Sequence, residues 1–458
     1  MVPEKFIIHG GTPLYGSVKV NGSKNAALPI LCAALLTKGR SIIRNVPKLM
    51  DVESMLKLLE TLGVCYKWLE GNTLQLEVVD DEPYEAPYDL VSQMRASICV
   101  LGPLLARRGK AKVARPGGCN IGIRPINLHI KGLQALGAEI WNERGYVMGQ
   151  AIGLRGRRIY LGGPNGSTVS GTANVMMAAT LAKGTTVIVH AACELVMEEL
   201  ARYLNACGAK IHGAGTTRII VEGTEELHGA EHTVIPDRIE AGTFVIAAAL
   251  TGGSVRVEGA RPDHLFAVID VLEEAGVSME LERDCIHVLE SGDFQPVDVT
   301  ALPYPGFPTD LQSQMTTLLS LAKGISVVTE KVYPDRFIHV AELNRMGARI
   351  RKEGNIAIIR GVNRLYGAPV MASDLRASAC LVLAGLVAEG ITEVRKIHHI
   401  DRGYEKIEER LRSLGAEIYR VPQEVDTSVY DSLHEVVREA SPRLRKRLVE
   451  DLLKRHRS

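Results

Sequence analysis

Residues 196–212 read VMEELARYLNACGAKIH, and they hold a pattern that recurs along the chain. Apolar residues return at helical spacing as far as Ala206. Gly208 follows after Cys207, and the strand-like run AKIH comes directly after it. Glycine at such a point is typical of a helix that ends in the left-handed conformation. The stretch therefore predicts a helix, a glycine stop and a short strand.

The same pattern appears six times, at glycines that lie 68 to 74 residues apart: Gly63, Gly137, Gly208, Gly276, Gly347 and Gly415. A second set of glycines recurs with the same period. Each of these glycines follows an apolar segment and precedes a β-rich run. Its members are Gly39, Gly109, Gly184, Gly253, Gly324 and Gly390. Two independent markers indicate six copies of one α/β unit. Because the period is longer than that of common solenoids, we expect two closed domains of three units each.

Length and composition agree with a protein of several domains. The chain has 458 residues, which is too long for one ordinary core, and it is 46% apolar and 23% charged. Its 54 basic and 53 acidic residues leave a net charge of +1. This balance argues against a general nucleic-acid or membrane surface, and it leaves room for a local anion site.

The eight cysteines are dispersed, without a CxxC pair or a matching His pair. We therefore expect neither a zinc site nor a disulfide framework. The N-terminal residues show no charged segment followed by a long apolar run, and no stretch is long enough to span a bilayer. The sequence predicts a cytoplasmic protein with reduced thiols and no stable membrane insertion.

The stretch RPGGCNIGIRPINLHI, residues 115–130, places Cys119 between Arg115 and Arg124. A thiol near cations has a lowered pKa and can act as a nucleophile or a proton donor. The alternative is a free cysteine that serves as a small buried apolar residue. The stretch by itself leaves both readings open.

Two further motifs place charged residues at the starts of helices. In NGSKNAALPI, residues 21–30, Lys24 and Asn25 follow a Gly-Ser turn, which suits a phosphate or carboxylate ligand or, alternatively, a solvent-exposed lysine. In YPGFPTDLQSQM, residues 304–315, three nearby prolines stiffen the approach to Asp310. That carboxylate is either a general base or an ordinary helix cap. Asp237 in PDRIEAGTF stands in a similar place.

Four arginines stand near turns at related positions of different repeats: Arg95, Arg336, Arg376 and Arg402. Each is by itself typical of a salt bridge or a surface charge. A closed repeat architecture can bring them into one cleft, which would suit a phosphate ester that also carries a carboxylate. The chain has no Walker motif and no GxGxxG after a strand, so we infer neither ATP nor NAD, and no cofactor or metal is expected.

Several stretches together resemble the enolpyruvyl transferases, and the loop around Cys119 is the most specific of them. They cover about residues 3–421. The stretches are GSKNAALPI, MRAS, RPGGCNIGIRPINLHI, VIPDRIEAGTF, PYPGFPTDLQSQM, RFIHVAELNRMGA, SDLRASA and HIDRGYE.

The resemblance implies an α/β fold of two inside-out α/β barrels, each made of three repeats of about 70 residues. The first domain would hold residues 1–23 and 236–423, and the second would hold residues 24–235. Residues 424–458 would form a basic helical tail, in which Leu444, Leu448 and Leu452 share one face. We favour a tail that packs on its own protein or is disordered over one that binds an unknown partner.

The resemblance also implies the reaction and four catalytic residues. The enolpyruvyl group of phosphoenolpyruvate would pass to the 3-hydroxyl of UDP-N-acetylglucosamine with release of phosphate, the first committed step of peptidoglycan synthesis. Cys119 resembles the cysteine that donates a proton to C3 of phosphoenolpyruvate and can form an adduct with it. Asp310 resembles the base at the sugar hydroxyl. Lys24 and Arg402 resemble part of the phosphoenolpyruvate clamp.

Contacts with the two substrates follow from the same resemblance. They fall on Lys24, Asn25, Arg95, Arg124, Pro125, Ile126, Asn127, Leu128, residues 166–169, Asp310, Val332, Arg336 and Arg376. Asp237 and Asp374 resemble residues that support the site.

Three places differ from the usual family pattern, and all belong to the domain that would hold the nucleotide sugar. Ser170-Gly171-Thr172 stands where the family usually has Gly-Ala-Thr, Cys193-Glu194-Leu195-Val196 where it has Arg-Glu-Pro-Glu, and Asn127 where it often has Asp. Two alternatives therefore remain. One is a divergent enzyme of secondary metabolism that modifies another uridine nucleotide such as UMP, and the other is an inactive nucleotide-sugar-binding regulator.

Overall fold

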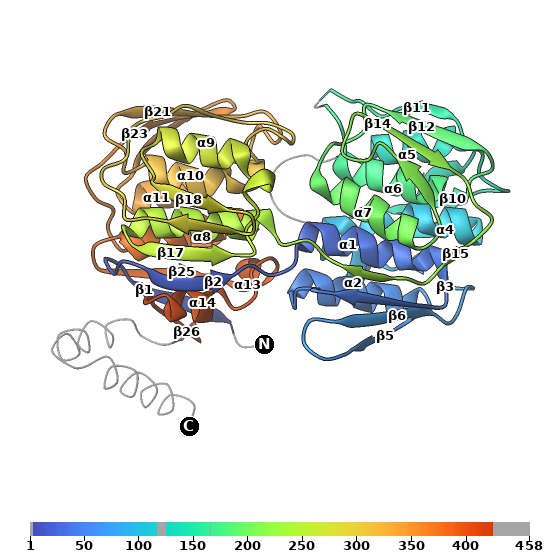
Figure 1. Ribbon diagram of the computed structural model, residues 1–458, viewed down its shortest axis with the longest axis horizontal. Coiled ribbons are helices and arrows are strands. Elements are labelled where there is room, and N and C mark those ends of the chain that lie inside the picture. Colours follow the sequence, from blue (N-terminus) through green and yellow to red (C-terminus); the bar gives the residue numbers. More distant parts are fainter. Residues whose placement is uncertain (1–2, 117–124, 165, 425–458) are drawn as a thin grey trace.

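The computed structural model describes residues 3–116, 125–164 and 166–424. It has two lobes that lie side by side (Figure 1). The lobe that we call terminal has a hydrophobic core from residues between Phe6 and Val20 and between Ile239 and Ile418. The lobe that we call central has a core from residues between Ala26 and Val234. The chain therefore begins in the terminal lobe, builds the central lobe and returns.

Each lobe contains three four-stranded sheets within the described ranges, and all six sheets share one topology. In every sheet one edge strand runs parallel to its neighbour, and the other two neighbouring pairs are antiparallel. This repetition of a mixed sheet with helices confirms the predicted α/β class.

The strands of the terminal lobe, in spatial order within each sheet, are β24 (Pro369–Met371), β25 (Ile391–Arg395), β1 (Glu4–His9) and β26 (Glu417–Pro422); β18 (Met279–Glu282), β19 (Cys285–Val288), β17 (Ser254–Glu258) and β2 (Tyr15–Lys19); and β20 (Val299–Ala301), β21 (Ile325–Glu330), β23 (Ile356–Arg360) and β22 (Arg349–Glu353). Its helices are α8 (Arg238–Thr251), α9 (Phe266–Glu274), α10 (Gln312–Leu319), α11 (His339–Arg345), α12 (Leu375–Val387), α13 (His398–Asp401) and α14 (Ile407–Ser413), with 3₁₀ turns at Pro262–His264 and Thr309–Leu311.

The strands of the central lobe are β7 (Glu85–Ala86), β8 (Lys110–Ala114), β10 (Tyr146–Gln150) and β9 (Glu139–Glu143); β11 (Arg158–Tyr160), β12 (Thr185–Val189), β14 (Arg218–Glu222) and β13 (Lys210–His212); and β16 (Glu231–Thr233), β4 (Arg40–Arg44), β6 (Leu74–Val78) and β5 (Val64–Trp68). β15 (Leu227–His228) and β3 (Thr37–Lys38) form a further pair. The helices are α1 (Lys24–Ala33), α2 (Met50–Thr61), α3 (Tyr88–Val91), α4 (Leu101–Arg108), α5 (Asn127–Ala135), α6 (Val169–Ala179) and α7 (Leu195–Ala206), with 3₁₀ turns at Ala34–Leu36 and Arg95–Val100.

The repeat glycines have the conformation that the sequence predicts. All six of the first set have φ between 81° and 106°, and each lies one to three residues before a strand. The quoted stretch is α7, Gly208 with φ 101°, and β13. In the second set Gly253 and Gly324 lack the positive φ. A Cβ at Gly253 would lie 1.8 Å from the Leu14 carbonyl oxygen, so close backbone approach explains that glycine.

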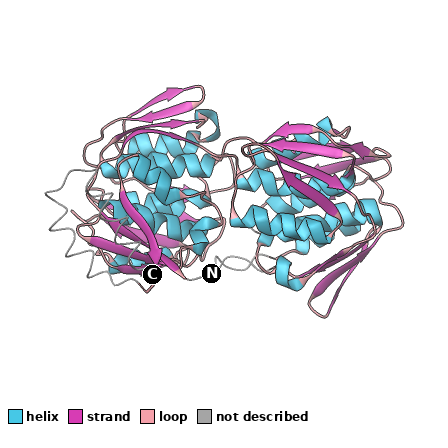
Figure 2. Ribbon diagram, turned by 90° about the horizontal axis from the view of Figure 1, so that it is seen from below, coloured by secondary structure: helices cyan, strands magenta, loops and turns pink. Residues whose placement is uncertain are grey.

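Helices lie in the middle of each lobe, and the sheets lie outside them (Figure 2). Nearly every residue of α8 and α12 is buried, as expected for helices that are apolar on all sides. Two segments cross between the lobes side by side. The Ser23 amide donates to the Ile235 carbonyl at 2.7 Å, and the Asp237 amide donates to the Asn21 carbonyl at 2.8 Å.

Candidate active site

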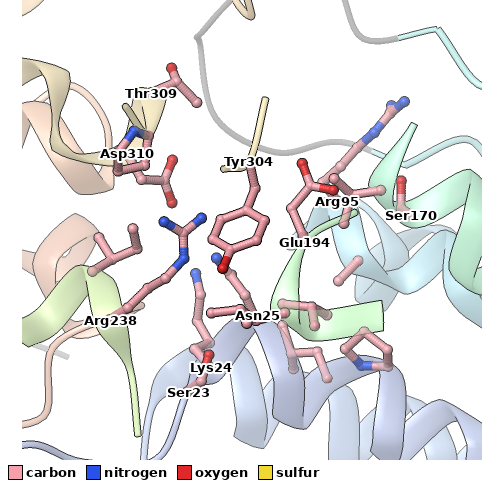
Figure 3. A pocket seen from close by; sticks show the side chains of 18 of the residues that line it. Ser23, Lys24, Asn25, Arg95, Ser170, Glu194, Arg238, Tyr304, Thr309 and Asp310 are labelled. Atoms are coloured by element: carbon pink, nitrogen blue, oxygen red, sulfur yellow. The ribbon is translucent and has the colours of Figure 1, made fainter. Parts of the chain in front are cut away.

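A cavity of about 330 Å³ opens between the lobes, beside these crossing segments. The central lobe lines it with the start of α1, the turn at Arg95 and the starts of α6 and α7. The terminal lobe lines it with the start of α8, the loop through Tyr304 to Asp310 and the start of α12. Figure 3 shows polar and charged side chains from both lobes facing this space.

Asp51 links two of the predicted catalytic cations. Its Oδ2 accepts a hydrogen bond from Lys24 Nζ at 2.9 Å, and its Oδ1 accepts one from Arg402 Nε at 2.9 Å. The three side chains are 5% to 14% exposed. Burial favours a raised pKa for Asp51, but the charges of Lys24 and Arg402 outweigh it and lower the pKa. Since Arg402 belongs to the terminal lobe, this ionised carboxylate also joins the lobes.

Asp310 is held by two arginines. Its Oδ1 accepts from Arg336 Nη1 at 2.7 Å, and its Oδ2 accepts from Arg376 Nη2 at 3.0 Å. Burial favours a raised pKa for Asp310, but the two guanidinium groups hold it well below its ordinary range. The carboxylate lies in the 3₁₀ turn before α10 and bonds side chains, so it is not an ordinary helix cap. Nη1 of Arg376 is buried without a hydrogen-bond partner among the described residues, and Arg376 lines the cavity.

Asp237 and Asp374 cap the two buried helices that begin at the cavity. Asp237 accepts from the amides of Ile239 and Glu240, and its other oxygen accepts from the Lys24 amide at 3.3 Å. Asp374 accepts from the amides of Arg376 and Ala377. Both carboxylates therefore fix backbone that carries Lys24 and Arg376, as N-cap side chains do.

The central-lobe wall carries a different set of groups. Arg95 and Ser170 line the cavity, and His129 lies buried behind Ser170. His129 Nε2 is 3.1 Å from Ser170 Oγ, and its Nδ1 is 2.9 Å from Asn174 Nδ2. Burial, together with the charge of Arg95, lowers the pKa of His129 to about 3. The histidine is therefore neutral at physiological pH.

The cavity brings together most of the predicted site residues. Those that line it are Lys24, Asn25, Arg95, Val169, Asp310, Val332, Arg336, Arg376 and Arg402. Pro125, Ile126, Asn127 and Leu128 are described but do not line it, and Asn127 is exposed at the start of α5. Cys119 and Arg124 lie outside the described residues.

The lining residues to which the sequence analysis gave no role include Asp51, Glu194, Arg238 and Tyr304. Asp51 lies in the first turn of α2, where an acidic residue is common for its effect on the helix dipole alone. The Arg238 guanidinium stacks on the Tyr304 ring with 5.1 Å to its centre. Arg238 directly follows Asp237 in PDRIEAGTF, a stretch that resembles the one around Asp310. This similarity is the sequence signal that could have identified Arg238.

The buried carboxylate of Glu194 is expected to lower the stability of the fold when it is ionised. Its Oε2 is buried without a hydrogen-bond partner among the described residues, and burial raises the pKa of Glu194. A carboxyl whose folded pKa lies above the unfolded value destabilises the fold once the pH exceeds the unfolded pKa. We therefore expect Glu194→Gln to raise the free energy of unfolding at pH 7.

Urea unfolding at pH 7 checks this expectation, with the exposed Glu225→Gln as a matched control that should leave stability unchanged. The gain should shrink as the pH falls through the folded pKa of Glu194, since the carboxyl becomes neutral there. A loss of stability in Glu194→Gln would instead show that the attraction of Arg238 outweighs burial.

A cleft lined by buried cations and a carboxylate thus lies between two repeat-built α/β lobes. The pattern of the family described as EPSP synthase (3-phosphoshikimate 1-carboxyvinyltransferase) matches residues 8–411, and the chain belongs to this family. A relative named UDP-N-acetylglucosamine 1-carboxyvinyltransferase from Methylacidiphilum infernorum is 53% identical over 419 residues, which is 91% of this chain and 99% of that protein. One of the same name from Gluconacetobacter diazotrophicus is 53% identical over 420 residues, with the same shares.

Solved structures agree with this assignment. The enolpyruvyl transferase NikO from Streptomyces tendae superposes with a TM-score of 0.83 at 25% identity, over 92% of this chain and 99% of that one. An EPSP synthase from Acinetobacter baumannii superposes with a TM-score of 0.71 at 19% identity, over 91% of this chain and 99% of that one, which shows a shared fold.

No helix in the described part of the chain has the length and apolar character needed to cross a membrane. The described ranges also contain no group of three or more His, Cys, Asp or Glu side chains arranged to hold a metal ion.

Proposed function

We propose that this chain transfers the enolpyruvyl group of phosphoenolpyruvate to the 3-hydroxyl of UDP-N-acetylglucosamine and releases phosphate, the first committed step of peptidoglycan synthesis. The chain is an enolpyruvyl transferase, and its relatives at 53% identity carry the name of this activity. The observation that carries the proposal is that Lys24, Arg402, Arg376 and Asp310 all line the same cavity.

The finer architecture belongs to the same proposal. Two inside-out α/β barrels of three repeats each would be formed by residues 1–23 with 236–423 and by residues 24–235. The two separate hydrophobic cores and the six sheets of one topology support this division. The basic tail, residues 424–458, lies outside the residues that the structure describes except for its first residue.

The cations of the cavity suit the charge of phosphoenolpyruvate. Lys24, Arg402 and Arg376 would bind its phosphate and carboxylate, and the resemblance adds Arg124 to this clamp. Buried guanidinium and ammonium groups bind such oxygens strongly because the surrounding dielectric is low. The partnerless Nη1 of Arg376 is a donor that a substrate oxygen would satisfy.

The reaction needs one acid and one base. Cys119 would donate a proton to C3 of phosphoenolpyruvate while the sugar oxygen O3 bonds to C2, and Asp310 would accept the proton of that hydroxyl. Loss of a proton from C3 and cleavage of the bond between C2 and the phosphate oxygen then give the enol ether and phosphate. The clamp stabilises the charge on the departing phosphate.

Substrate charge would tune Asp310 for this role. In the structure Arg336 and Arg376 hold the pKa of Asp310 so low that it is a poor base. An anionic substrate that draws Arg376 toward itself weakens this pairing, and the pKa of Asp310 then rises toward its ordinary value. Binding of phosphoenolpyruvate would thus make the carboxylate a better base.

The central-lobe wall would bind the nucleotide sugar, with Asn25 between the substrates. Arg95 and Val169 line the cavity there, and the resemblance adds Arg124 to Leu128 and residues 166–169. Asp310, Val332 and Arg336 complete the set from the terminal lobe.

The alternative acceptor, another uridine nucleotide such as UMP, has less support. The chain is 53% identical to enzymes named for the nucleotide sugar and 25% identical to NikO. An inactive regulator would have no use for a proton donor, and the sequence retains Cys119 together with Lys24, Asp310 and Arg402.

We place the reaction in the cytoplasm. The seven cysteines that the structure describes are free thiols, which suits a reducing compartment.

The product identifies the reaction. The purified chain, phosphoenolpyruvate and UDP-N-acetylglucosamine should give a nucleotide sugar whose NMR spectrum shows two vinyl protons and a substituted O3. The 3-deoxy analogue should give no phosphate, because it lacks the attacking hydroxyl. Equal phosphate release with that analogue would indicate hydrolysis and contradict the proposal.

A further inference from the structure

The hydroxyl of Ser170 is one end of a hydrogen-bonded chain that runs from the backbone into the cavity. Ser170 lies in the first turn of α6 and lines the cavity beside Arg95 (Figure 3). This series of hydrogen bonds runs from the Gly102 amide through Asn174 and His129 to Ser170. Asn174 is fully buried and His129 is 1% exposed, so this is a built interior feature.

Two backbone groups that contact Asn174, the Gly102 amide and the Ile98 carbonyl, fix which atom donates in each of these hydrogen bonds. The Gly102 amide can only donate, so the atom that it contacts at 2.7 Å is the Oδ1 of Asn174. The two protons of Asn174 Nδ2 then go to the Ile98 carbonyl at 2.8 Å and to Nδ1 of His129 at 2.9 Å. Nδ1 of His129 is therefore an acceptor and carries no proton.

Neutral His129 must then carry its proton on Nε2, which donates to Ser170 Oγ at 3.1 Å. The serine oxygen is the acceptor in that bond, so its own O–H proton is left to donate elsewhere. Among the described residues that proton has no recorded acceptor. A hydroxyl in this state, on a cavity wall next to an arginine, is a directed donor for a ligand oxygen.

We propose that Ser170 donates a hydrogen bond to an oxygen of the bound nucleotide sugar, and that His129 and Asn174 are positioning residues that set the direction of this donor. The proposal rests on the proposed function, because the clamp of Lys24, Arg376 and Arg402 would occupy the other part of the cavity with phosphoenolpyruvate.

Removal of the donor should weaken acceptor binding without slowing the chemistry. In Ser170→Ala the KM for UDP-N-acetylglucosamine should rise about 10-fold, the usual effect of losing one hydrogen bond to a ligand. kcat and the KM for phosphoenolpyruvate should stay within about twofold, since the clamp and Asp310 are untouched. Ser54→Ala on α2, which removes a hydroxyl that bonds Gln93 outside the cavity, is the matched control.

Two variants of His129 separate positioning from packing. In His129→Gln the amide nitrogen can replace Nε2 as donor, and acceptor KM should remain near that of the unaltered protein. In His129→Asn the shorter amide cannot reach Ser170, and acceptor KM should rise as in Ser170→Ala. The double variant His129→Asn with Ser170→Ala should have the same acceptor KM as Ser170→Ala alone. Both changes act on the same hydrogen bond from Ser170 to the ligand, so their effects should not add. Thermal unfolding confirms that each variant is folded.

Binding of UDP and of uridine, measured by calorimetry, identifies the oxygen that is bound. A loss of affinity in Ser170→Ala for UDP but not uridine assigns a phosphate oxygen, and a loss for UDP-N-acetylglucosamine alone assigns a sugar oxygen. Unchanged acceptor KM and unchanged affinities for all three ligands would overturn the proposal. Failure of the unaltered protein to turn over UDP-N-acetylglucosamine would instead count against the proposed function, and the UDP measurement would still test Ser170.

Discussion

Replacing Asp310 by Asn will lower kcat about 1000-fold, the size of effect that general-base catalysis commonly provides. The amide keeps the shape of the carboxylate but cannot take the proton of the sugar hydroxyl. The KM for phosphoenolpyruvate should not rise, because Arg336 and Arg376 remain and lose a competing negative charge. A fall in kcat with substrate binding intact is the signature of a group that acts in the transition state.

Steady-state kinetics with both substrates, and thermal unfolding as a check of folding, provide the measurement. Asp270→Asn, at an exposed position of α9 in the same lobe, should leave kcat unchanged. A kcat within about tenfold of the unaltered protein, well short of the effect of general-base catalysis, would remove Asp310 from the role of base.

Replacing Asp51 by Asn will lower the free energy of unfolding by about 3 kcal/mol at pH 7, because Lys24 and Arg402 then remain as buried cations without their shared counter-ion. Phosphoenolpyruvate should stabilise this variant more than the unaltered protein, since its negative charges replace the one that was lost. The pKa of Asp51 is lowered in the fold, so its contribution is complete above the ordinary carboxyl pKa and is lost as the pH falls through the folded value. The difference between the two proteins should therefore narrow in acid.

Urea unfolding from pH 7 to pH 3, with and without phosphoenolpyruvate, measures all three effects. The exposed ion pair between Arg44 and Glu231 offers a control. Glu231→Gln should change stability by less than about 0.5 kcal/mol, since solvent screens that pair. An Asp51→Asn protein as stable as this control, at every pH, would show that Asp51 does not balance the two cations.

The fold was predictable because its unit is short and its signals are local. A glycine that ends a helix needs a positive φ, and this requirement leaves a visible mark in the sequence at Gly63 and its five counterparts. Two members of the second set, Gly253 and Gly324, do not have a positive φ. At Gly253 the requirement is close approach to Leu14, a contact between residues far apart in sequence that the local pattern does not contain.

The site was predictable where its residues belong to local motifs, and less so where they act through distant partners. Lys24 and Asp310 stand in distinctive turns, whereas Asp51 looks like an ordinary acidic residue near a helix start. Its role follows from Arg402, which is 351 residues away in the chain. Ser170 is similar, because its free proton follows from His129 and Asn174 and not from its own neighbours in sequence.

The most direct measurement of the central claim is phosphate release from phosphoenolpyruvate with UDP-N-acetylglucosamine, run beside UMP as acceptor and beside Cys119→Ala. The proposed function predicts release with the nucleotide sugar, little with UMP, and its loss in Cys119→Ala. Release with UMP alone, or with neither acceptor, would contradict it and make the substitutions at residues 170–172 and 193–196 the main guide to a different acceptor.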